Sequence, residues 1–180
     1  MVLFDSCGII YEMNADSFRK FYDYHFAENR KIWEICNASM TYEQFTQSVD
    51  YSHGCVRDQI VHIMNADEMW FSELRNAEPI ELTPSAKVDD RKIIRAHWDS
   101  VEQRMKAYLA HLQDDMLFEK PIKEPEEDKD LFVWQVLMHV ANHGTDHRAQ
   151  IHRLLKDLGI RTTSQDYIFY VYERNASSMS

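Results

Sequence analysis

The chain has 180 residues, a length that suits one domain, and we expect a single domain over residues 1–180. It holds only four Gly and four Pro, which disfavours β-sandwiches and barrels because those folds need frequent turns. The net charge of −10 disfavours nucleic acid and anionic membranes as partners. An acidic, all-α domain with a surplus of histidine, nine in all, is the expectation.

The cysteines and the N-terminus bear on the compartment. Cys7, Cys36 and Cys55 are widely spaced and form no CxxC pair, which is typical of reduced thiols in the cytosol. The first residues lack a basic region and carry Asp5 within the apolar stretch, so they make a poor signal peptide. No apolar run approaches the roughly 20 residues that span a bilayer. These features predict a soluble, cytoplasmic protein.

Proline positions divide the chain into helical spans, because proline breaks helix interiors. The prolines fall in two clusters, Pro79 with Pro84 and Pro121 with Pro125, and a polar break runs from Ser39 to Gly54. The spans between these breaks predict four long helices, near residues 15–38, 53–77, 88–113 and 130–158.

Periodicity and capping residues support these helices. Asn14 and Ser52 are expected N-caps, the acidic residues 126–130 suit the start of the fourth helix, and Gly159 is expected to end it. The third helix shows the apolar steps of four and three that are typical of a bundle seam, at Ile94, Trp98, Val101, Met105, Tyr108 and Leu112.

Two further segments stand out. Residues 114–130 carry eight acidic residues and three lysines, and we interpret them as a solvated connection. Residues 167–172 are six consecutive apolar or aromatic residues, which should bury against something. They pack either on their own bundle or on a second copy in a homodimer.

The fourth helix carries His139, His143 and His147, each four residues from the next. Two imidazoles one turn apart share a helix face and can bind one ion at about 2.1 Å. The outer two are about 12 Å apart along the helix, so only one neighbouring pair can chelate, and spacing does not choose the pair. His62, on an apolar face of the second helix, is a candidate third ligand. A hydrogen-bonded core histidine is the alternative.

Other known signatures are absent from the sequence. No histidine has Glu three positions before it, as di-iron bundles require, and HExxH does not occur. The glycine-rich nucleotide motifs and GxSxG are also missing.

Two segments carry a family resemblance. NHGTDHRAQIHRLLKDLG, residues 142–159, resembles the last-helix signature of the DinB/YfiT-like family, and residues 55–70 resemble its motif of a mid-helix His followed by Trp. The resemblance implies an up-down-down-up four-helix bundle with a long second-to-third helix crossover, often dimeric. It also implies a divalent metal, zinc or nickel, held by His62, His143 and His147.

Under this resemblance, neighbouring residues gain expected roles. His139 becomes a core residue or a support for the ligands, and Asp58 and Asp146 are candidates to orient them. Arg148 and Gln150 match the signature, and Arg148 either binds an anionic group or pairs with the acidic surface. Cys55, two turns before His62, is expected to pack in the core rather than act in catalysis.

The family includes S-transferases and isomerases that use thiols such as bacillithiol or mycothiol, and other members are described as hydrolases. A three-His ion with open positions can bind a thiolate or activate water. We therefore expect a metal-dependent enzyme acting on a small molecule, with a low-molecular-weight thiol in the transferase case. The alternatives are a non-enzymatic, metal-stabilised stress-response or interaction bundle, and a protein whose three histidines are hydrogen-bonded core residues without metal.

Overall fold

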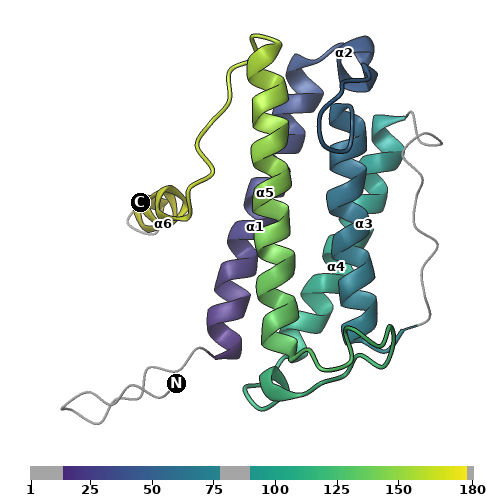
Figure 1. The fold of residues 1–180 in the computed structure, drawn as a ribbon. Coiled ribbons are helices and arrows are strands. Elements are labelled where there is room, and N and C mark those ends of the chain that lie inside the picture. The colour runs from purple at the N-terminus through teal and green to yellow at the C-terminus, as the bar shows by residue number, and fades with distance from the viewer. Residues whose placement is uncertain (1–13, 78–89, 178–180) are drawn as a thin grey trace.

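The computed structural model describes residues 14–77 and 90–177, and every regular element in these ranges is a helix (Figure 1). This confirms the predicted all-α class. The long helices are α1 (Ala15–Ser39), α3 (Val56–Leu74), α4 (Arg91–His111) and α5 (Val133–Asp157). The short ones are α2 (Tyr42–Thr46), the 3-10 helix η2 (Met116–Phe118) and α6 (Tyr167–Ser177).

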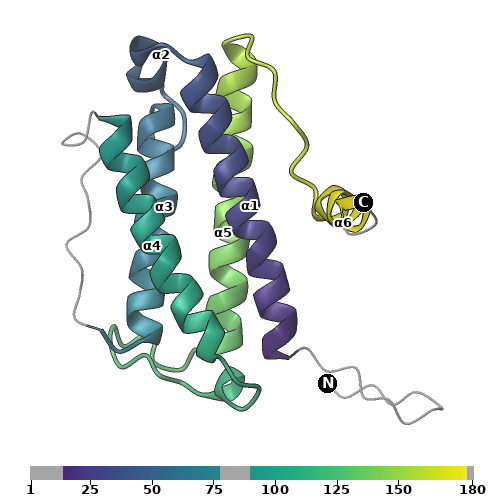
Figure 2. The same cartoon turned by 180° about the vertical axis from the view of Figure 1, so that it is seen from behind.

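The four long helices lie side by side in two layers. α3 and α5 form the face seen in Figure 1, and α1 and α4 form the face seen from behind in Figure 2. α1 and α5 run in one direction, and α3 and α4 run in the opposite direction. The facing surfaces of α3 and α5 carry the histidines singled out in the sequence.

The core follows the predicted periodicity. Ile94, Trp98, Val101 and Met105 of α4 are buried, and Tyr108 packs partly buried against them. No helix within the described ranges is both long enough and apolar enough to cross a bilayer.

The ends of the helices agree only in part with the predictions. The Asn14 side chain accepts a hydrogen bond from the backbone N–H of Ser17, and Gly159 follows α5 with a φ of +72°, both as predicted. Ser52 is not an N-cap, because the chain turns there with a φ of +50° and Cys55 occupies that position. The acidic residues 126–130 lie in turns, and α5 begins only at Val133.

Some predictions concern residues that the structure does not describe. Cys7, Pro79, Pro84 and the expected start of the third helix at residue 88 lie outside the described ranges.

The short helices were not predicted. α2 forms inside the polar break, where Thr41 and Gln44 make a capping box and the buried Phe45 meets Trp33 edge-on at 6.4 Å. α6 lies across the outside of the bundle (Figure 1), where its Tyr167 and Tyr170 rings contact Tyr24 of α1 at 5.2 and 5.6 Å.

The structure does not bury this C-terminal segment: no residue of α6 is fully buried. Four of its side chains stay 44–59% exposed: Tyr167, Ile168, Phe169 and Tyr172. Contact with the bundle is therefore partial, and the homodimer stays a prediction.

Candidate metal centre

The three histidines expected to bind metal meet between α3 and α5. The Nε2 atoms of His62 and His143 lie 3.0 Å apart. The His147 ring lies 4.4 Å from the His62 ring and 4.3 Å from the His143 ring, measured between centroids. The structure thus brings together the three predicted residues, while their role as ligands stays a prediction.

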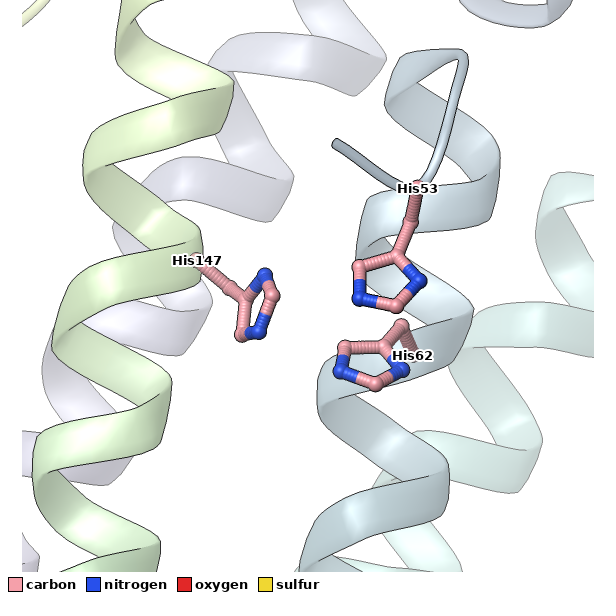
Figure 3. A group of neighbouring side chains, drawn as sticks. All are labelled: His53, His62 and His147. Atoms are coloured by element: carbon pink, nitrogen blue, oxygen red, sulfur yellow. The ribbon is translucent and has the colours of Figure 1, made fainter. Parts of the chain in front are cut away.

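A fourth histidine, His53, joins them from the turn before α3. Its ring stacks on His62 at 3.6 Å with an angle of 18° between the planes, and lies 5.1 Å from the His147 ring. One nitrogen from each of His53, His62 and His147 falls within 4.8 Å of the others (Figure 3). Sequence reasoning missed His53 because it lies in a turn, where no helical spacing links it to the others.

Amide side chains orient His147. Its Nδ1 lies 3.2 Å from both Gln59 Oε1 and Gln150 Oε1, and these oxygens can only accept, so Nδ1 carries the proton. Gln150 in turn donates to Asp146 Oδ2 at 3.0 Å. Asp146 therefore acts on His147 through Gln150. The lone pair on His147 Nε2 is left for a ligand.

Burial keeps these imidazoles neutral. It lowers the pKa of His62 to about 4, with the neighbouring imidazoles of His53 and His147 adding to the effect. It also lowers the pKa of His143 to about 3, and that of His147 in the same direction. Neutral imidazole is the form that binds metal, so the group is ready for a metal ion at neutral pH.

The facing nitrogens also fit a metal ion. The Nε2 of His143 faces the Nε2 of His62 at 3.0 Å, while the buried Nδ1 of His143 has no hydrogen-bond partner and carries the proton when Nε2 uses its lone pair. Only one proton can lie between those two nitrogens, whereas a divalent ion uses both lone pairs. Two nitrogens on a tetrahedral zinc ion lie about 3.4 Å apart, close to the observed separation.

A buried polar cluster supports this face of α5. Arg148 is fully buried, and its guanidinium donates to Asn29 Oδ1 at 2.7 Å and to Thr145 Oγ1 at 3.0 Å. It therefore ties α5 to α1, and the expected pairing with the acidic surface is wrong. Gly144 permits the close approach, because a Cβ there would lie 2.5 Å from Cε1 of the buried His25.

The remaining candidates lie around the site. His139 is exposed and meets the Trp70 ring at 5.0 Å, so it is not a core residue. Asp58 pairs with Arg57 at 3.0 Å and lies against Gly54, in the turn that carries His53. Cys55 is buried as expected, and burial raises the pKa of its thiol.

A cavity of about 380 Å³ lies beside the same turn, lined by residues that include Tyr51, Cys55 and Arg153. None of the four histidines lines it. We place the chemistry at the histidines, because there imidazole nitrogens from α3, α5 and the turn before α3 lie close enough together to share one ion.

Comparison with known proteins supports the resemblance. The sequence model of the DinB family matches residues 13–176. The chain belongs to the DinB family. It is similar to Protein DinB of Bacillus subtilis (strain 168), with 24% identity over 160 residues that cover 85% of this chain and 92% of that protein. The range matched by the DinB family includes all four histidines of the candidate centre.

Proposed function

We propose that this DinB-family protein is a divalent-metal-dependent enzyme acting on a small molecule, with zinc or nickel held by His62, His143 and His147. The observation that carries the proposal is the pair of facing Nε2 atoms of His62 and His143, 3.0 Å apart. The proposal includes an up-down-down-up bundle with a long crossover between α3 and α4, which the helix directions in Figure 1 support.

A bound ion with open positions supplies a Lewis acid that holds a thiolate, or a water of lowered pKa, beside the substrate. The residues of the chain prepare that position. Gln59 and Gln150 hold the proton of His147 on Nδ1, which turns its Nε2 toward the site. Burial keeps His62 and His143 neutral.

Thiol transfer is the reaction that the donor set favours. The group of close potential ligands found in the described part of the chain, His53, His62 and His147, consists of imidazoles alone, and so does the proposed set of His62, His143 and His147. Neutral ligands leave the full charge of the ion in place, and this charge favours an anionic ligand such as the thiolate of a low-molecular-weight thiol. Hydrolysis by an ion-bound water is the second reaction of the same centre.

One observation favours a different class of function. His53 provides a fourth imidazole beside His62 and His147, and four protein ligands are typical of a closed, structural zinc site. A closed site would make the protein a non-enzymatic, metal-stabilised bundle.

The two functions separate in one assay. Metal-loaded protein is mixed with bacillithiol and a chloro-dinitro aromatic acceptor, so that a carbon–sulfur bond forms, the carbon–chlorine bond breaks and chloride leaves. Absorbance of the thioether product follows the rate, and a nitrophenyl ester tests hydrolysis in parallel. We expect turnover with metal that is lost in metal-free protein and in His143→Ala, and retained in His111→Ala, which alters an exposed histidine of α4. Equal rates with and without metal in both assays would contradict an enzymatic role.

A further inference from the structure

We propose that His53 is a fourth, displaceable ligand of the ion, carried on the turn of residues 51–54 and released when an outside ligand enters. This inference rests on the proposed metal centre. It reconciles the two functions above, since one turn would close the centre at rest and open it for substrate.

The position of His53 supports ligation. Its ring lies face to face with His62, and Figure 3 shows both rings beside His147, which faces them from α5. The stack holds the His53 ring next to His62, and because the lone pair of an imidazole nitrogen lies in the ring plane, the exposed His53 ring has to tilt out of this stack to share an ion with His62. The potential ligand nitrogens of all three residues already lie within 4.8 Å of one another.

The turn is also linked to the centre through a hydrogen bond. The Ser52 hydroxyl donates to Gln150 Oε1, the same oxygen that accepts from His147 Nδ1. Ser52 at a φ of +50° and Gly54 at a φ of +94° bend the backbone back over α3. The Gln150 side chain therefore holds both Ser52, the residue before His53, and the ring of His147 in place.

The same geometry explains why His53 can leave. His147 is buried and the His62 ring is half-buried, both on long helices, whereas His53 is exposed on a turn. Its ring can swing outward without separating α3 from α5. An entering thiolate would take the coordination position that the His53 nitrogen gives up, so the number of ligands stays the same.

The test uses the full-length protein loaded with Co²⁺, whose visible absorption reports the number and type of ligands. We expect His53→Ala to change the wild-type spectrum and to weaken Zn²⁺ binding about tenfold, as loss of one contributing group does. Added imidazole should restore the wild-type spectrum, and His111→Ala should match the wild type throughout. A titration with β-mercaptoethanol should reach its midpoint at about tenfold lower thiol in His53→Ala, because no protein ligand competes.

The outcomes separate the two proposals. Wild-type protein that binds neither Co²⁺ nor Zn²⁺ overturns both. Metal binding with the same spectrum and affinity in His53→Ala overturns only the ligand role of His53. A changed spectrum in His53→Ala, together with the same thiol midpoint as in the wild type, overturns only the claim that an entering thiolate displaces His53.

Discussion

The Nε2 atoms of His62 and His143 face each other at 3.0 Å across the contact between α3 and α5. Neither helix alone creates this pair, since 81 residues separate the two histidines in the sequence. Packing of α3 on α5 therefore determines whether the nitrogens can share an ion.

Gln59→Leu should separate metal binding from stability. The change removes the oxygen that accepts from His147 Nδ1, so Zn²⁺ affinity should fall about tenfold, as for other groups that orient ligands. It also removes the buried Gln59 Nε2, which has no hydrogen-bond partner, so the metal-free protein should be no less stable. Competition with a chromogenic chelator measures the affinity, and urea unfolding measures the stability.

Gln103→Leu is the matched control for that variant, because Gln103 is an exposed glutamine of α4. It should leave Zn²⁺ affinity unchanged. If Gln59→Leu binds Zn²⁺ as tightly as this control, Gln59 does not orient His147 for the metal ion.

The lowered histidine pKa values predict acid sensitivity of the metal-free protein. Burial lowers the pKa of His62 from 6.5 to about 4 and that of His143 from 6.5 to about 3. The unfolded chain therefore binds more protons, and the stability contributed by the neutral imidazoles is fully present above 6.5. It should be lost progressively as the pH falls from 6.5 toward 4 and 3.

Urea midpoints measured with a chelator present, at several pH values across that window, check this dependence. His143→Ala should show a shallower fall, because one of the groups with a lowered pKa is gone. An identical fall in the variant would show that His143 titrates as it does in the unfolded chain.

Gly144→Ala tests the close approach of α1 and α5. Helix propensity alone predicts that alanine stabilises this interior position by about 1 kcal/mol. Contact with the buried His25 ring, 2.5 Å from the new Cβ, predicts a net loss of about 3 kcal/mol instead. A stabilised variant in urea unfolding would contradict the packing described here.

Gly159→Ala gives the comparison for that experiment. No atom lies within 4 Å of a Cβ at Gly159, so only its φ of +72° opposes the change. The expected loss is about 1 kcal/mol, smaller than at Gly144.

Helical spacing made much of the site predictable. His143 and His147 lie one turn apart, so their shared face follows from the geometry of any α-helix. The apolar face around His62 pointed inward, and the bundle then placed it opposite α5. The choice of the 143/147 pair came from the family resemblance, since spacing left 139/143 open.

Turns and surface segments were less predictable, because local spacing does not determine them. Ser52 has the side chain of an N-cap, but the positive φ values at Ser52 and Gly54 make a turn that delays α3 to Val56. That turn brings in His53 through a tertiary contact with no sequence period. α6 likewise depends on aromatic contacts of Tyr167 and Tyr170 with Phe21 and Tyr24 of α1, far away in the sequence.

Metal content is the most direct test of the central claim. Untagged wild-type protein and His143→Ala are purified without chelator, and the metal in each is measured by elemental analysis beside the protein concentration. We expect about one zinc or nickel ion per wild-type chain, as a three-His centre holds, and a large loss of metal in the variant. Wild-type protein with far less than one ion per chain, unable to take up either metal when it is supplied, would contradict this claim.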